Sequence, residues 1–296
     1  MSASVSTKDL LGGLLVIFIW ALNSAVIKFI TIEVPPFTGL ALRFVLACAI
    51  FAAFFRPLAK DKFSLMLQIT ILLAVLHWST LIWGIDKLDI STANIVLQTQ
   101  VIFATFLGWL MFKEKIGWRT TAGMLCGIAG VIILVGLPKE PPSLIGVIVL
   151  LFSMLMLASS YTRQKLLTDV SPLNYIAHLH LLGLIPVIAL AFAFEKPAEV
   201  EWQNINLWIL LPCLLFQVFI VSGAHTIWQR LMNRNQLSIL PNLTLLLPIL
   251  GVILGIIFFD ETLHRGIIFG GLLTMAGVGI IMFRQQKKQR IKGQEQ

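Results

Sequence analysis

Nine polar or aromatic side chains lie inside otherwise apolar stretches of the sequence and have the chemistry to bind an organic molecule. Indole rings stack on planar groups, amides and imidazoles exchange hydrogen bonds, and a guanidinium can pair with a carboxylate through two parallel hydrogen bonds. The candidate binding residues are Trp20, Asn23, Arg43, His77, Trp78, Asn94, Gln98, His180 and Trp228. Their types predict a site for a small organic molecule.

The sequence argues against catalysis, a metal centre or a cofactor. A catalytic site would need a grouped nucleophile, base or metal ligands, but the histidines are scattered and no GxSxG motif is present. The three cysteines form no CxxC pair. The sequence also lacks the GxxxxGK[ST] loop that binds nucleotide phosphates. We therefore expect no enzyme activity, no cofactor, no metal and no ATP site.

Long apolar runs carry these candidate residues. The chain has 296 residues, of which 58% are hydrophobic and 12% charged, whereas soluble domains carry about twice that share of charge. Each run has about twenty residues, enough for a helix to cross a hydrocarbon core of about 30 Å. The runs predict an all-α polytopic membrane protein with ten transmembrane helices, at residues 10–30, 37–55, 64–84, 90–112, 118–136, 143–162, 174–194, 205–229, 237–259 and 266–283.

The basic residues between the runs predict an orientation. With ten spans, sixteen Lys and Arg side chains fall on the side that holds both termini, and five fall on the other side. Cytoplasmic loops are the ones enriched in Lys and Arg. We therefore expect both termini in the cytoplasm, in a multi-pass protein of the plasma (inner) membrane. The net charge of +8 is then explained by membrane topology and gives no reason to expect nucleic acid as a partner.

Arg43 lies about six residues inside the second run, roughly 9 Å below the outer surface. No Asp or Glu lies deep in any run to pair with it. Either its side chain reaches back to the interface, or it faces the path of an anionic substrate.

One face of the fourth run carries Asn94, Gln98 and Thr105 within a stripe about 60° wide. A face of the ninth run carries Pro241 and Pro248, whose missing N–H groups free carbonyls that need partners or water. We expect both faces to line a central cavity; the alternative is that the polar groups only join helices. The histidines leave the same choice between substrate contact and packing.

The sequence contains an internal repeat. Residues 107–134 align with 254–281 without a gap, so that Gly108, Glu114 and Gly123 match Gly255, Glu261 and Gly270. Five helices per copy is an odd number, so the second copy enters the membrane inverted, as in many secondary transporters. We expect two five-helix repeats, 1–140 and 141–296, around a central cavity within one membrane domain.

These features together resemble the EamA family of the drug/metabolite transporter superfamily. The resemblance rests on WxxN…K in the first run (Trp20, Asn23, Lys28), on Arg43 in LRF, and on the glutamates near the ends of the fourth and ninth runs. The family usually has a proline thirteen residues before each of these glutamates. Pro248 fits this pattern, but position 101 is Val, so we expect the fourth helix to lack the break that the ninth has.

The resemblance implies a secondary transporter, most often an exporter of small metabolites such as amino acids, that works by alternating access. A transporter of drugs, nucleosides or sugars with the same fold is the alternative. A channel or a membrane enzyme agrees less well with the inverted repeat. The expected partners are a small-molecule substrate and membrane lipids, and we expect a monomer, with a dimer as the alternative.

Overall fold

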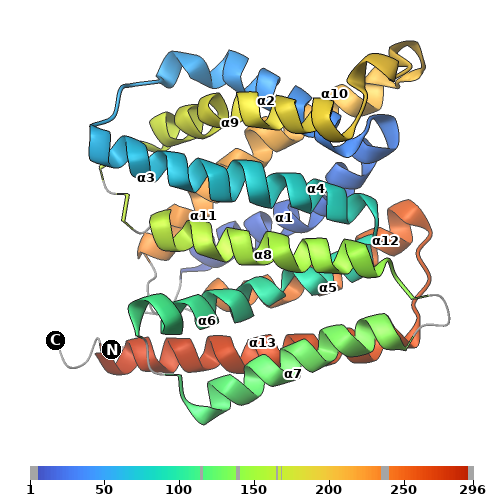
Figure 1. The fold of residues 1–296 in the computed structure, drawn as a ribbon. Helices are drawn as coiled ribbons and strands as arrows, with labels where there is room; N and C mark the ends of the chain where they lie inside the picture. Colours follow the sequence, from blue (N-terminus) through green and yellow to red (C-terminus); the bar gives the residue numbers. More distant parts are fainter. Residues whose placement is uncertain are drawn as a thin grey trace. The chain divides into compact units, whose positions relative to one another are not determined.

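The computed structural model describes residues 6–113, 116–137, 141–164, 166–167, 169–234 and 240–292. Within these ranges the chain forms helices and no strand (Figure 1). Ten helical segments in this part of the chain are long and apolar enough to cross a membrane, which confirms the predicted number. The glutamate at position 114 lies outside the described residues.

Five of the ten spans are single helices. They are α1 (Thr7–Glu33), α7 (Trp118–Gly136), α8 (Leu144–Gln164), α9 (Pro172–Phe194) and α13 (Arg265–Lys292).

The other five spans are composite. The second joins α2 (Pro36–Phe51) to the 3₁₀ turn η1 (Ala52–Phe54), and the third joins α3 (Lys60–Thr70), the π-helix η2 (Ile71–His77) and α4 (Trp78–Asp86). The fourth comprises α5 (Ile90–Leu97) and α6 (Thr99–Phe112).

The eighth span comprises α10 (Leu207–Leu215), the π-helix η5 (Phe216–Val221) and α11 (Ser222–Arg234). The ninth joins the 3₁₀ helix η6 (Leu240–Leu246) to α12 (Leu247–Phe259). Two 3₁₀ turns, η3 (Pro197–Glu199) and η4 (Trp202–Asn204), precede α10.

The helices form two compact units. Unit 1 comprises residues 1–25, 89–144 and 221–296, and unit 2 comprises 26–88 and 145–220. Each unit therefore contains helices from both halves of the sequence.

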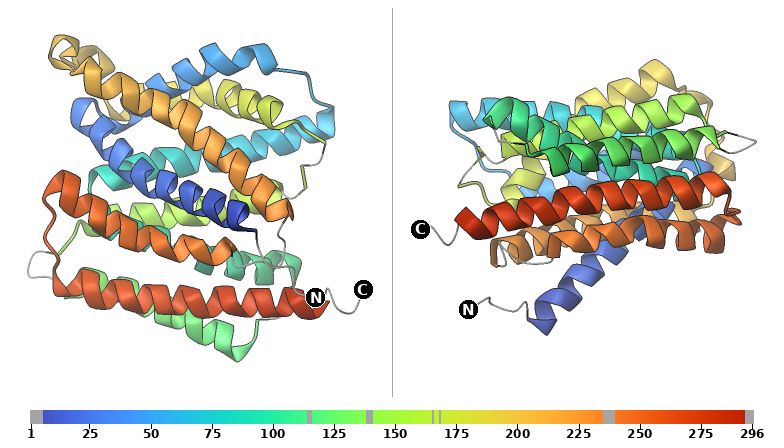
Figure 2. Two further views of the ribbon diagram at one scale, coloured as in Figure 1. Left: turned by 180° about the vertical axis from the view of Figure 1, so that it is seen from behind. Right: turned by 90° about the horizontal axis from the view of Figure 1, so that it is seen from below.

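In unit 1, α7 and α13 pack in antiparallel orientation over most of their length (Figure 2). A Cβ atom at Gly123 would lie 2.8 Å from the carbonyl oxygen of Gly277, and one at Gly130 would lie 2.7 Å from that of Gly270. The two backbones are thus too close for any larger residue. Small residues at helix interfaces of membrane proteins allow backbones to approach in this way.

The helices α5 and α12 of unit 1 also pack together, and Glu261 fixes their ends. Its carboxylate accepts hydrogen bonds from the backbone N–H groups of Ile90 and Ser91 and from the Ser91 hydroxyl. These are N–H groups of the first turn of α5, which have no partner inside the helix. The carboxylate also lies at the positive end of the helix dipole. The end of the ninth span therefore meets the beginning of the fourth, and the two run antiparallel.

The fourth span is interrupted at Gln98, which corrects the expectation that it has no break. Helix α5 ends at Leu97 and α6 begins at Thr99. The backbone N–H of Gln98 bonds to Ile95, and that of Val101 bonds to Gln98, both with the i to i−3 spacing of a 3₁₀ turn. A tightened turn can thus interrupt the helix where the sequence has no proline.

Unit 2 shows the same capping arrangement on different helices. The Glu195 carboxylate, directly after α9, accepts hydrogen bonds from the backbone N–H groups of Phe37 (2.8 Å) and Thr38 (2.7 Å) and from the Thr38 hydroxyl (2.7 Å). At the other end of this helix pair, the Asn174 side chain bonds to both backbone groups of Arg56. Helices α2 and α9 are therefore antiparallel and joined at both ends.

Lys28 caps a helix of unit 2. Its ammonium group donates to the carbonyl oxygens of Ile85 (3.2 Å), Asp86 (2.7 Å) and Leu88 (3.0 Å). These carbonyls belong to the last turn of α4 and the residues that follow, which lack the full set of N–H partners of a helix interior. The lysine of the WxxN…K pattern is thus bound to the end of α4.

Candidate functional site

A cluster of aromatic rings surrounds the buried guanidinium of Arg43 in unit 2. The guanidinium carbon lies 4.2 Å from the centroid of the Trp78 ring. The His180 ring lies 5.7 Å from Trp78 and 5.0 Å from Phe44, and Phe44 lies 5.8 Å from Trp78. We call Arg43, Phe44, Trp78 and His180 the Arg43 cluster. It brings together three of the residues that the sequence analysis selects.

Close packing of three spans holds the Arg43 cluster in place. Arg43 and Phe44 lie on α2, Trp78 is the first residue of α4, and His180 lies on α9. A Cβ atom at Gly183 of α9 would lie 2.6 Å from the Phe44 ring, so only glycine allows this approach of α9 to α2. The π-helix η2 ends immediately before Trp78 and thereby sets the direction in which the ring points.

Two buried nitrogen atoms of the Arg43 cluster have no hydrogen-bond partner among the described residues. They are Nε of Arg43 and Nε2 of His180. The Nδ1 atom of His180 lies 2.9 Å from the carbonyl oxygen of Ile176, which can only accept. Nδ1 therefore carries the proton, and the neutral ring presents Nε2 as an acceptor. The cluster thus contains one unused donor and one unused acceptor.

Arg43 is only 8% exposed and has no acidic partner in the part of the chain that the structure describes. A charged side chain at membrane depth costs about 3 kcal/mol on insertion scales. A desolvated cation–π contact stabilises the cation by about 2 kcal/mol and so offsets most of this cost. The Trp78 ring stabilises the charge but provides no hydrogen-bond acceptor in its plane, so the guanidinium can still bind an anion.

His77 is held by a neighbouring helix. Its Nδ1 atom lies 2.8 Å from the Ser153 hydroxyl of α8, and that hydroxyl donates to the His77 carbonyl at 2.9 Å. This pair ties the π-helix η2 to α8. His77 is recognisable in the sequence but its partner is not, because nothing in the sequence around Ser153 indicates which helix it faces.

A second aromatic group lies in unit 1. Trp20 of α1 lies 5.2 Å from the rings of both His225 and Trp228 on α11. The indole N–H of Trp20 is buried and has no partner among the described residues. Asn23 is half-buried one turn further along α1. The structure thus brings together Trp20 and Trp228, which the sequence analysis proposes separately.

Asn94 and Gln98 bind neighbouring helices in unit 1. The Asn94 side chain donates to the Ile90 carbonyl (2.9 Å) and accepts from the Ser24 hydroxyl of α1 (3.3 Å). The Gln98 amide donates to the carbonyl oxygen of Thr244 at 2.8 Å. Pro248 is four residues after Thr244 and has no N–H to donate to that carbonyl. Gln98 therefore supplies a hydrogen bond where the proline of the ninth span cannot.

The described residues contain no group of three or more side chains that could hold a metal ion. Glu195 is a further positioning residue that the sequence does not single out. A carboxylate directly after an apolar helix is the available signal, but its partner helix lies about 157 residues away in the sequence.

Comparison with known proteins supports a common fold and a common family. The model of the EamA-like transporter family matches the chain twice, over residues 7–136 and 144–283. A solved crystal structure superimposes with a TM-score of 0.64 at 14% identity and covers 96% of this chain and 99% of its own, which shows the fold alone.

Several curated relatives match nearly the full chain. A protein of Salmonella typhimurium named "Probable amino-acid metabolite efflux pump" is 26% identical over 98% of this chain and 100% of its own length. An Escherichia coli protein with the same name is 26% identical over 97% and 99%. A Bacillus subtilis protein named "Uncharacterized transporter YoaV" is 24% identical over 92% and 95%.

Proposed function

Because the chain belongs to the EamA-like transporter family, and is therefore an integral multi-pass membrane transporter of small molecules, we propose that it exports metabolites that carry a carboxylate, amino acids among them. The observation that carries this proposal is the Arg43 cluster. A guanidinium with no acidic partner among the described residues is a binding group for an anion at membrane depth.

The other members of the Arg43 cluster suit the remaining parts of an amino acid. The neutral His180 ring offers Nε2 as an acceptor for an ammonium group, since its Nδ1 proton is committed to Ile176. The Trp78 and Phe44 rings offer apolar surface for a side chain. Two curated relatives named amino-acid metabolite efflux pumps support the same substrate class.

We propose that transport proceeds by alternating access between two inverted repeats, 1–140 and 141–296, around a central cavity. The family model matches each half of the chain separately, which supports a duplication. The antiparallel pairs α2 with α9, α5 with α12 and α7 with α13 join corresponding spans of the two halves: the second with the seventh, the fourth with the ninth, and the fifth with the tenth. Corresponding helices that run antiparallel are what an inverted repeat requires.

Two equivalent helix ends add support for the repeat. Lys113 after α6 and Asp260 after α12 are 147 residues apart, and both have a left-handed backbone with φ of 51°. Their backbone N–H groups bond to Gly108 and Gly255, which are also 147 residues apart. The same local geometry thus recurs at the repeat offset of the sequence.

The proposed setting is the inner membrane with both termini in the cytoplasm, which follows from the sixteen-to-five distribution of basic residues. In this orientation, Glu195 and Glu261 cap α2 and α5 on the outer side. Transport is expected to need no ATP, because the sequence has no nucleotide-binding loop.

The experiment compares export by cells that express the wild-type chain, Arg43→Lys, Arg43→Gln or the control Arg56→Gln. Arg56 is exposed at the end of the same span, so its change removes the same charge outside the Arg43 cluster. The measurement is the amino-acid content of the medium per amount of protein in the membrane.

We expect the wild type and Arg56→Gln to export equally, Arg43→Lys to export less because it loses the bidentate fork, and Arg43→Gln to export least. The proposal is wrong if Arg43→Gln keeps full export per molecule, or if none of the four chains changes the amino acids in the medium.

A further inference from the structure

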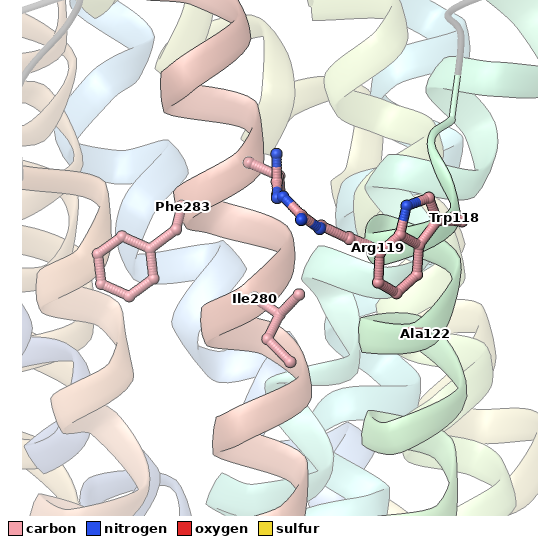
Figure 3. Close-up of a pocket in the computed structure, with 6 residues that line it drawn as sticks. Trp118, Arg119, Ala122, Ile280 and Phe283 are labelled. Carbon is pink, nitrogen blue, oxygen red and sulfur yellow. The ribbon is translucent and has the colours of Figure 1, made fainter.

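A pocket lies between one end of α7 and the later part of α13, within unit 1. It has a volume of about 400 Å³. Figure 3 shows Trp118 and Arg119 on α7, with Ile280 and Phe283 on α13. The lining residues are Trp118, Arg119, Ala122, Ile280, Phe283 and Arg284. None of them belongs to the Arg43 cluster or to the group formed by Trp20, His225 and Trp228.

The lining changes from charged to apolar along the helices. Both of its charged members are arginines, Arg119 in the first turn of α7 and Arg284 at the end of the membrane-spanning part of α13. Ala122 and Ile280 lie one turn further into the spans and are apolar. Beyond them, from Gly123 onward, the two helices are in backbone contact and leave no space. The pocket is therefore cationic at the membrane boundary and apolar toward the membrane interior.

Trp118 marks the level of the interface. Its side chain is 75% exposed, and the Arg119 guanidinium carbon lies 5.1 Å from the centroid of its ring. Tryptophan is enriched at the level of lipid headgroups, where one edge of the indole contacts apolar chains and its N–H contacts polar groups. The two arginines are thus placed at headgroup depth.

A smaller hollow of about 140 Å³ adjoins the pocket on its polar side. It shares Trp118, Arg119 and Arg284 with the main pocket and adds Gly117 and Thr120. The added residues contribute a hydroxyl and backbone surface close to the same two guanidinium groups. A ligand would therefore place its anionic part here and its apolar part against Ala122 and Ile280.

We propose that this pocket is a binding site for an anionic phospholipid. The phosphate pairs with Arg119 and Arg284, the glycerol region contacts Trp118, and an acyl chain contacts Ala122 and Ile280. A basic pocket between transmembrane helices at the membrane boundary has the charge and the polarity gradient that such a lipid needs. A free phosphate would use the arginines but leave the apolar lining without a partner.

The experiment uses native mass spectrometry of the purified full chain in detergent, with phosphatidylglycerol or phosphatidylcholine of identical acyl chains. The variants are Arg119→Gln with Arg284→Gln, and Arg119→Lys with Arg284→Lys. The control is Lys60→Gln with Arg230→Gln, which removes two exposed cations outside the pocket. Thermal unfolding of each variant verifies that it is folded.

We expect the wild type to retain phosphatidylglycerol in preference to phosphatidylcholine. The double Gln variant should bind phosphatidylglycerol roughly thirtyfold more weakly, since each boundary cation contributes close to a factor of five. The double Lys variant should keep most of the binding because it keeps both charges, and the control should bind like the wild type.

Three results would overturn the proposal. One is equal retention of the two lipids by the wild type. Another is a loss in the control as large as in the double Gln variant, which would indicate general charge attraction. The third is displacement of phosphatidylglycerol by millimolar inorganic phosphate, which would make the site one for a free anion. If the double Gln variant does not fold, the double Lys variant provides the test. Weak binding of phosphatidylglycerol by the folded double Lys variant would also contradict the proposal.

Discussion

The capping of α5 by Glu261 leads to a prediction about stability. The carboxylate accepts three hydrogen bonds, one from the Ile90 N–H on one oxygen and two from Ser91 on the other. In Glu261→Gln one oxygen becomes an NH₂ group, which can only donate. The amide can keep its oxygen toward Ser91, so the bond from the Ile90 N–H is the one that is lost, and two donors face each other there.

The size of the effect follows from these contacts. A hydrogen bond to a charged group contributes about 1.5–3 kcal/mol. One lost bond gives about 1.5 kcal/mol at the low end of that range, which applies because Glu261 is half-buried and water can replace part of the loss. The lost attraction between the carboxylate and the helix dipole adds up to about 1 kcal/mol. We expect Glu261→Gln to lower the thermal midpoint by roughly 5–10 °C.

The measurement is thermal unfolding of the purified protein in detergent, followed by intrinsic fluorescence. Glu195→Gln should give a similar decrease, because Glu195 accepts the same set of bonds from Phe37 and Thr38. The control is Glu199→Gln, whose ion pair with Lys196 is exposed and contributes under about 1 kcal/mol. A midpoint for Glu261→Gln equal to that of the control would show that Glu261 does not stabilise the start of α5.

Three further predictions concern other parts of the fold. Lys28→Met should destabilise the protein by about 2 kcal/mol and lower its thermal midpoint, because it removes the ammonium group from the end of α4. Lys28→Arg should recover part of this loss. Equal midpoints for the wild type and Lys28→Met would contradict the capping role. Gly130→Val should reduce the yield of folded protein and destabilise it by about 2 kcal/mol or more, since the α13 backbone leaves no room for a side chain. Gly136 has open space around it, so Gly136→Val should leave the yield and the stability unchanged. Equal effects of the two substitutions would disprove the close contact. A reporter active only outside the cytoplasm, fused after Gln296, should stay silent, and strong activity would reverse the proposed orientation.

The sequence predicts the number and ends of the spans well because hydrophobic length is a local property. The predicted first, third and tenth runs, 10–30, 64–84 and 266–283, differ by only a few residues from Thr7–Glu33, Lys60–Asp86 and Arg265–Arg284. Glycines four residues apart, such as Gly123 and Gly127, are also a local signal of close helix contact, and the α13 backbone does approach Gly123 closely.

Features that depend on contacts between distant parts of the chain are not predictable in this way. The sequence has no proline that would indicate the break at Gln98. The Gln98 side-chain amide donates to the carbonyl oxygen of Thr244, which is 146 residues away in the sequence. Glu195 and Glu261 are each recognisable as span-end carboxylates, but the helix that each one caps is determined by packing. The π-helix before Trp78 cannot be predicted from the pattern of apolar residues either.

The candidate site was partly accessible from sequence. Arg43, Trp78 and His180 are conspicuous as polar or aromatic residues in apolar runs, and the structure places their side chains in one cluster. Phe44 completes this cluster but could not be distinguished from the other nineteen phenylalanines. Whether these residues bind substrate stays a prediction.

The most direct test of the account is counterflow by the purified protein in liposomes. Vesicles are loaded with an unlabelled amino acid, and the uptake of a trace of labelled amino acid from outside is measured without added nucleotide. The parallel reaction uses the carboxamide of the same amino acid as the internal substrate.

We expect transient accumulation with the amino acid and a much weaker one with its carboxamide, and we expect Arg43→Gln to remove the difference between the two. Counterflow that is equal for acid and amide in the wild type, or unchanged in Arg43→Gln, would contradict the proposal that a carboxylate is recognised at the Arg43 cluster.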